Sequence, residues 1–148
     1  MLIDMKVKLL TLALVPLLFM GCNDLFDSGD WDKTWDGLEL GLFPQSQEVN
    51  LEDGATTIEV QLIGEQQSED VNVDFAVSGS AEEGVHYDIA TPSPVTIEAG
   101  TSTVDIEVEL IEDSLDEGES GTLVITLEES SDVELANNLL ESVTTITE

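Results

Sequence analysis

Apolar and polar residues alternate along the chain from Leu38 onward, and this period of two most constrains the fold. In the segment TVDIEVELI, Val104, Ile106, Val108 and Leu110 alternate with acidic residues. The segments TTIEVQLIG, VNVDFAV and TLVITL repeat the pattern. Successive side chains of an extended strand point to opposite faces, so a period of two predicts strands with one buried and one wet face.

Turn-forming residues separate these segments, as in EDG at 52–54, GEQQSED at 64–70 and TPSP at 91–94. Adding LELGLF, PVTIE and SVTTIT gives about seven short strands, and only DVELANNLLE is compatible with a helical turn. The pattern predicts an all-β chain, an immunoglobulin-like antiparallel β-sandwich of about seven strands. In SVTTIT, Val143 and Ile146 have opposite parity, so we expect a bulge or irregular pairing there.

Residues 1–21 have the features of a signal peptide. Lys6 and Lys8 precede the apolar run LLTLALVPLLFM, which ends at Gly21 and Cys22. The run is too short to cross a hydrocarbon layer about 30 Å thick. The true start, Met1 or Met5, is left open by the sequence.

Gly21-Cys22 resembles the lipobox of bacterial lipoproteins, in which the cysteine carries lipid. The resemblance implies that Cys22 attaches the protein to a membrane, while an ordinary cleaved signal would leave a free thiol. Residues 22–37 form an acidic tether, similar to signals that send some bacterial lipoproteins to the cell surface. We therefore expect an outer-membrane lipoprotein of the cell envelope, exposed at the surface.

Two tryptophans, Trp31 and Trp35, lie in this tether. Aromatic rings in a polar segment can stack on sugars, or they can cover the edge of the domain that follows. Both alternatives remain open at this point.

The charge of the chain excludes nucleic acid as a partner. Asp and Glu number 33 against three Lys and Arg, for a net charge of −30. Binding nucleic acid requires basic residues that displace counterions from phosphates, and only Lys33 remains once the signal is removed. The expected partners are the membrane, reached through the lipid, and an envelope protein or glycan.

The domain at 38–148 resembles Calx-beta domains, found in sodium/calcium exchangers and in bacterial surface proteins. Three stretches carry the resemblance: VNLEDG, GSAEEGVHYDI and VTIEAGTSTVDIEVELIEDSLDEGE. They are similar to the family's Glu-containing turn, its Gly-x-Asp-Tyr segment, and its long strand followed by an acidic loop.

The resemblance implies Ca²⁺ as the ligand of this domain. Carried over residue by residue, Glu52, Glu112, Asp113 and Glu117 match ligand positions of the family. His86 stands where the family has an aspartate, and imidazole is a poor ligand for a hard cation. A solvated acidic loop is the alternative, because so acidic a chain gathers carboxylates by chance.

The residues favour a protein that is not an enzyme. A catalytic His86 would need a nucleophile or acid held nearby, and no Gly-x-Ser-x-Gly motif or other ordered triad signature is present. Tyr87 is expected to bury its ring at the edge of the sandwich. We expect a binding or structural module, with a calcium-binding module as the competing hypothesis.

Overall fold

The computed structural model describes residues 37–130 and 132–148. Residues 36–148 form a compact unit of their own. The predicted signal peptide, Cys22, Trp31 and Trp35 lie outside the described residues, so these predictions are not tested by the structure. Within the described part of the chain, no helix is long and apolar enough to cross a membrane.

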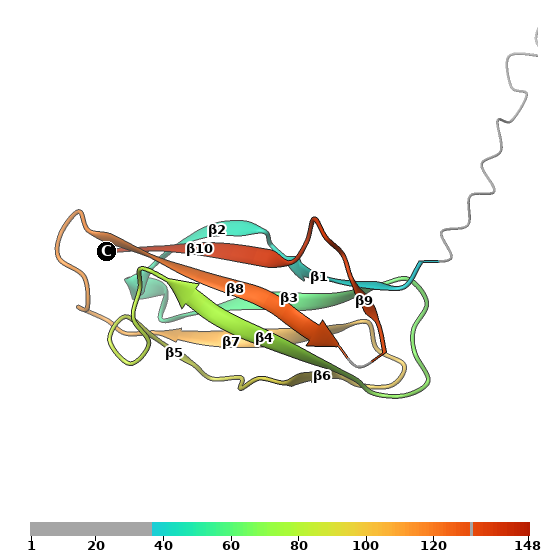
Figure 1. Cartoon of the computed structure of the whole chain (residues 1–148). Helices are drawn as coiled ribbons and strands as arrows, with labels where there is room; N and C mark the ends of the chain where they lie inside the picture. Colours follow the sequence, from blue (N-terminus) through green and yellow to red (C-terminus); the bar gives the residue numbers. More distant parts are fainter. Residues whose placement is uncertain (1–36, 131) are drawn as a thin grey trace, which may run out of the picture. The chain divides into compact units, whose positions relative to one another are not determined.

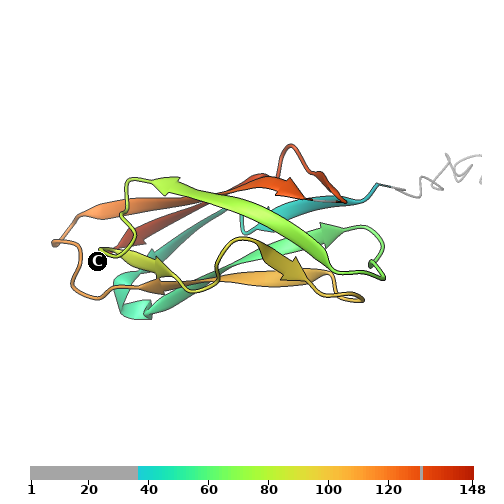
Figure 2. The same ribbon diagram turned by 60° about the horizontal axis from the view of Figure 1, so that its bottom comes forward.

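Ten strands form two sheets that pack face to face (Figures 1 and 2). Sheet A has the order β5-β7-β3-β1-β9, and sheet B the order β2-β10-β8-β4-β6. The strands are β1 (Glu39–Phe43), β2 (Ser46–Asn50), β3 (Ala55–Ile63), β4 (Val71–Gly79), β5 (Tyr87–Ile89), β6 (Val95–Ile97), β7 (Thr103–Leu110), β8 (Ser120–Ser130), β9 (Glu134–Leu135) and β10 (Glu141–Thr147). The predicted β-sandwich is confirmed.

The core lies between the two sheets. Ile58 and Val60 of β3 and Ile106 of β7 face it from sheet A, and Leu123 and Ile125 of β8 face it from sheet B; none of the five has measurable exposure. These are alternate residues of the segments that the sequence identified. The period of two therefore predicted the buried faces of β3, β4, β7 and β8.

Three strands were not predicted, namely β2, β5 and β9, and each lies at the edge of a sheet. The segment SQEVN of β2 has no apolar alternation, and it is held by pairing in parallel with β10. The second parallel pair joins β9 to β1, so the sheets are not wholly antiparallel. The segment considered for a helical turn contains β9 and a turn instead.

The bulge expected in SVTTIT is absent, because β10 pairs with β8 without interruption from Glu141 to Thr147. Ser142 and Thr144 face the core instead, with exposures of 0% and 1%. The Ser142 hydroxyl donates to the Pro44 carbonyl at 2.6 Å, and Gln47 Nε2 donates to Thr144 Oγ1 at 3.1 Å. These bonds satisfy polar groups that burial would otherwise destabilise.

The register shift lies elsewhere, between β4 and β8. Asp74 is opposite Glu129 and Phe75 is opposite Leu127, so one extra residue of β8, Glu128, stands at the shift. Such an insertion keeps Phe75 and Leu127 on the core side while the strand bends.

Candidate metal site at one end of the sandwich

Glu52 lies in a tight turn, the 3-10 helix η2 (Leu51–Asp53), which links β2 to β3. Asn50 caps this turn, since its side-chain oxygen accepts from the Glu52 N–H at 2.8 Å. In turn, the Asp53 carboxylate accepts a hydrogen bond from the backbone N–H of Asn50 at 2.9 Å. Gly54 ends the turn with a φ of 73°, and the buried Leu51 fixes it to the core. The turn therefore holds Glu52 at a defined place on the surface.

Two backbone hydrogen bonds gather three loops at this end of the sandwich. The Leu110 N–H donates to the Gly54 carbonyl at 2.9 Å, which joins the η2 turn to the start of the acidic loop. The Ile111 N–H donates to the His86 carbonyl at 3.0 Å, which joins the loop before β5 to the same point. Segments far apart in the sequence thus meet where β7 ends.

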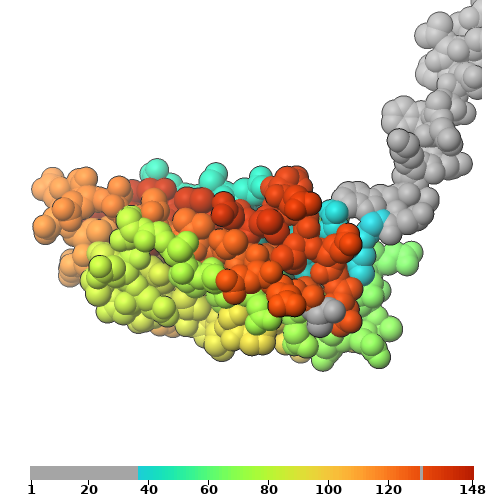
Figure 3. Space-filling view, viewed as in Figure 1, coloured from blue at the N-terminus to red at the C-terminus, as the bar shows by residue number. Residues whose placement is uncertain are grey.

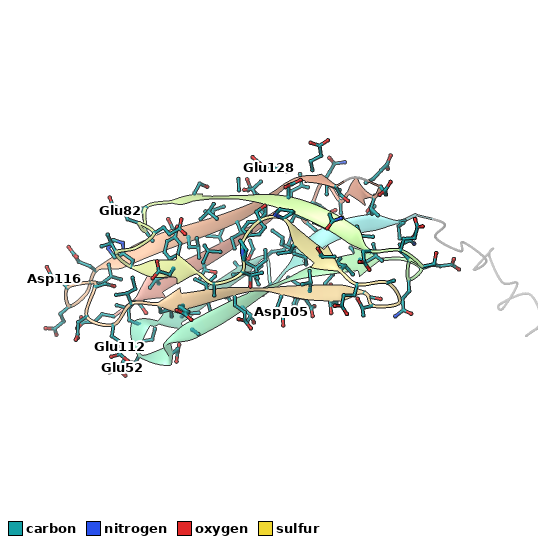
Figure 4. The ribbon with its side chains drawn as sticks, turned by 90° about the horizontal axis from the view of Figure 1, so that it is seen from below. Glu52, Glu82, Asp105, Glu112, Asp116 and Glu128 are labelled. Carbon is teal, nitrogen blue, oxygen red and sulfur yellow. The ribbon has the colours of Figure 1, made fainter. Side chains whose placement is uncertain are left out.

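Glu52, Glu112 and Asp113 line one pocket of about 250 Å³, together with Asn50, Leu51 and Glu148. Figure 4 shows Glu52 and Glu112 next to each other at this end of the domain. Asp113 has a φ of 57° and is the only non-glycine residue of the described chain with a positive φ. Three of the four predicted ligands therefore line the same pocket.

Glu117, the fourth predicted ligand, does not line this pocket. It follows Asp116, which lies at the far tip of the acidic loop in Figure 4. A separate turn shapes the tip, because the Glu119 N–H donates to the Asp116 carbonyl at 2.8 Å. Leu115 packs against the core between the two halves of the loop. The loop thus divides into a pocket side and an exposed tip.

The pocket offers oxygen atoms and negative charge to a cation. None of residues 37–148 is Lys or Arg, so no basic side chain of this domain offsets the carboxylates. Carboxylate and carbonyl oxygens are the ligands that Ca²⁺ prefers, in sets of six to eight. Among residues 37–130 and 132–148, however, no three acidic, histidine or cysteine side chains are grouped closely enough to hold a metal ion. The donor chemistry fits a hard cation, and the carboxylates are spread apart.

His86 has a structural role in the loop before β5. The His86 ring nitrogen Nδ1 accepts from the backbone N–H of Glu82 at 2.9 Å, and the backbone N–H of His86 donates to the Glu82 carbonyl at 2.9 Å. This reciprocal pair of hydrogen bonds closes the loop before β5. Tyr87 next to it is 3% exposed, so its ring is buried as predicted. Burial raises the pKa of the Tyr87 hydroxyl, and the nearby charge of Glu83 raises it further.

Two polar residues that line the pocket were not predicted, Asn50 and Glu148. The parallel register of β2 and β10 places Asn50 opposite Thr147, which brings Glu148 to the same end. No local signal marks either residue, because the pairing of two distant strands creates their proximity.

The profile of the Calx-beta domain family matches residues 35–147. The chain belongs to the Calx-beta family. This match covers both sheets and every residue that lines the pocket except Glu148. No curated protein sequence matches the chain.

Solved structures share the Calx-beta fold with this chain. The apo-form Calx CBD1 domain superposes with a TM-score of 0.64 at 19% identity, over 76% of this chain and 97% of that one. The Calx CBD2 domain gives 0.63 at 13% identity, over 75% and 88%. A structure described as calcium binding domain CBD12 of CALX1.1 gives 0.62 at 21% identity, over 74% of this chain and 44% of that one. Identities this low establish the fold alone.

Proposed function

We propose that the protein is a non-enzymatic binding module of the cell envelope whose loop end binds Ca²⁺ weakly and becomes stiffer on binding. One observation carries the proposal: Glu52 and the pair Glu112 and Asp113, about sixty positions apart in sequence, line one pocket with Glu148. A solved structure with the same fold, CBD12 of CALX1.1, is described as a calcium binding domain. The family membership and the carboxylate lining support the same ligand.

Weak binding follows from the arrangement of the carboxylates. Because they are spread apart, a cation must draw them together against their mutual repulsion and must order the acidic loop. Extracellular calcium modules with dissociation constants of about 10⁻⁴ to 10⁻³ M provide the appropriate scale. In return, the bound cation neutralises the repulsion between the η2 turn and the acidic loop.

The location is part of the proposal. We propose that Cys22 carries lipid, that residues 22–37 form the tether, and that the domain stands at the outer surface of the envelope. In this position it would contact a partner protein or a glycan. The basis is the lipobox-like Gly21-Cys22 at the end of the apolar run.

A thermal melt of residues 36–148, in EDTA and in Ca²⁺ about tenfold above its dissociation constant, tests calcium binding. A ligand that binds only the folded state then stabilises it by about 1.4 kcal/mol. For a domain of this size, that is a rise of several degrees in Tm. Ionic strength is matched between samples, and Mg²⁺ replaces Ca²⁺ in a parallel melt.

Asp113→Asn removes one pocket carboxylate, while Asn tolerates the left-handed backbone of position 113. Asp116→Asn makes the same change of charge at the exposed tip of the same loop and serves as the matched control. We expect Asp113→Asn to abolish the Ca²⁺-specific rise and Asp116→Asn to retain it. Equal small rises with both cations, or equal responses of both variants, would reduce the effect to charge screening and contradict the proposal.

A further inference from the structure

The two outer faces of the sandwich differ in charge. On sheet A, the register places Glu59 directly opposite Asp105, and Asp88 directly opposite Glu109. Like charges in opposite positions of neighbouring strands repel each other. This face therefore repels anions.

The centre of the outer face of sheet B is uncharged. Ser78 of β4 is opposite Val124 of β8, which is opposite Val143 of β10. One pair further along, Thr122 is opposite Thr145. These residues point outward, because the residues that alternate with them in β8 are buried. Figure 3 looks onto this face, where β4, β8 and β10 (green to red) form a continuous surface.

A hollow of about 540 Å³ lies at one end of this face. The hollow and the carboxylate pocket lie at opposite ends of β10. Glu141, where the strand begins, lines the hollow, and Thr147, where it ends, is followed by Glu148 of the carboxylate pocket. The lining residues are Gln45, Thr126, Asn137, Asn138, Leu140, Glu141 and Val143. The volume is in the range of sites for small molecules, about 300 to 1,000 Å³.

Backbone hydrogen bonds to both sheets hold the wall of the hollow in place. The connection between β9 and β10 is fixed at two successive carbonyls: Leu139 accepts from the Leu42 N–H at 2.8 Å, and Leu140 accepts from the Leu127 N–H at 2.9 Å. The opposite wall is fixed by the Val143 N–H, which donates to the Gln45 carbonyl at 2.9 Å. A ligand that enters such a preformed site pays little ordering entropy.

The lining combines groups that both donate and accept hydrogen bonds with two apolar side chains. Asn137 and Asn138 are exposed amides, each with two N–H donors and a carbonyl acceptor, and Thr126 adds a hydroxyl. Glu141 is the single charged group of the lining and only accepts. Gln45 Nε2 donates to the backbone carbonyl of Asn138, which joins the two walls.

From this chemistry we propose that the hollow binds a neutral saccharide. Hydroxyl groups of a sugar both donate and accept, as the amides require, and its C–H faces pack on apolar side chains such as Leu140 and Val143. The net charge of −30 disfavours an anionic ligand. A cationic ligand would find more carboxylates on sheet A than the single one here. The site does not depend on calcium, because it shares no residue with the carboxylate pocket.

Nuclear magnetic resonance of the full chain tests the proposal, since the side-chain amides of Gln45, Asn137 and Asn138 give their own signals. The protein is ¹⁵N-labelled and held in a detergent without a sugar headgroup, in EDTA. Glucose, galactose, mannose and N-acetylglucosamine are titrated at millimolar concentrations. Glucuronate and glucosamine are the anionic and cationic controls. We expect saturable shifts of these three side chains with at least one neutral sugar, and weaker shifts with both charged controls.

The double variant Asn137→Asp/Asn138→Asp removes the amide donors at exposed positions and keeps the shape of both side chains. We expect it to weaken binding of the responding sugar by about tenfold or more. The matched control is Asn72→Asp on β4, exposed on the same sheet outside the hollow, where the Oδ1 that accepts from Thr96 is retained. It should bind like the unaltered protein.

Three results would overturn the proposal. The first is that no neutral sugar of the set shifts the three side-chain amides. The second is that glucuronate or glucosamine shifts them as strongly as the best neutral sugar does. The third is that the double variant, with its backbone spectrum otherwise intact, binds as tightly as Asn72→Asp. Because the titration is done in EDTA, its failure leaves the calcium proposal untouched, and the reverse also holds.

Discussion

The backbone N–H of Leu110 donates to the carbonyl oxygen of Gly54 at 2.9 Å, and this bond joins the η2 turn to the acidic loop. Ala55 and Glu109, the next residues inward, are the last pair of the β3–β7 ladder. The hydrogen bond therefore extends the ladder to the start of both loops. It explains how Glu52 and Glu112 come to line the same pocket.

Replacing Gly54 by alanine should lower the free energy of unfolding of residues 36–148 by about 1 to 2 kcal/mol, the usual cost of a left-handed conformation. Gly54 has a φ of 73°, and apart from its chain neighbours no residue places an atom within 4 Å of the position that a Cβ would occupy. The cost is thus conformational rather than steric. Gly54→Asn should cost less, because asparagine tolerates this region better. Urea denaturation measures both, and an alanine variant as stable as the asparagine variant would contradict the argument.

Stability at alkaline pH should depend on one side chain. Residues 36–148 contain no Lys, Arg or Cys, and Tyr87 is the only tyrosine. Burial, and then the charge of Glu83, raise the pKa of Tyr87 above its ordinary value of 10.0. The unfolded chain therefore loses this proton first. The contribution of Tyr87 to the free energy of unfolding is therefore fully present below about pH 10, and it is lost as the pH rises through the folded-state pKa.

Urea denaturation of residues 36–148 at a series of pH values above 9 measures this effect. Tyr87→Phe should remove the alkaline decrease in the free energy of unfolding. Glu83→Gln should make the decrease smaller, because it removes the second cause of the raised pKa. An unchanged alkaline decrease in Tyr87→Phe would mean that another process unfolds the domain.

Ser142→Ala should destabilise the domain by about 1 to 3 kcal/mol, because it removes the donor to the Pro44 carbonyl from a fully buried position. Ser46→Ala is the matched control, since Ser46 is exposed on β2 opposite Val143. Thermal denaturation of the two variants compares them. If both variants melted at the same temperature, the hydrogen bond from Ser142 to Pro44, in the connection between β1 and β2, would contribute no stability.

The lipid anchor is tested by Cys22→Ala in the full chain expressed in a bacterium with lipoprotein-processing enzymes. We expect the unaltered protein to partition into the detergent phase and the variant into the aqueous phase, because one cysteine would carry the entire anchor. Each buried methylene group contributes about 0.8 kcal/mol to membrane attachment. A variant that still entered the detergent phase would show that lipid at Cys22 is not the anchor.

Local pattern predicted the long strands and their buried faces, but it was misleading where a polar residue faces the core. Val143 and Ile146 suggested a bulge because burial was assigned to the apolar residues. In the sandwich, Ser142 and Thr144 take the inward positions, since Pro44 and Gln47 of the neighbouring segment provide hydrogen-bond partners. Partners that come from another part of the chain leave no trace in the local alternation.

The candidate sites show the same division. The resemblance to Calx-beta domains identified Glu52, Glu112 and Asp113, which line one pocket, and also Glu117, which does not line it. Asn50 and Glu148 reached the pocket through the pairing of β2 with β10. The hollow beside Gln45 gave no signal in the sequence. Its side-chain amides come from two distant connections: Gln45 lies between β1 and β2, and Asn137 and Asn138 lie between β9 and β10.

The sequence by itself determined the class of fold and the buried sides of β3, β4, β7 and β8, because a side-chain period of two is a local property of an extended backbone. It also determined the net charge of −30, from which we expect no nucleic-acid partner. The tertiary structure alone decided which distant segments meet. The order of the strands and their register bring Glu52 to Asp113 and Gln45 to Asn138. Sheet order arises from packing of the whole core, so neither site could be assembled from one stretch of residues.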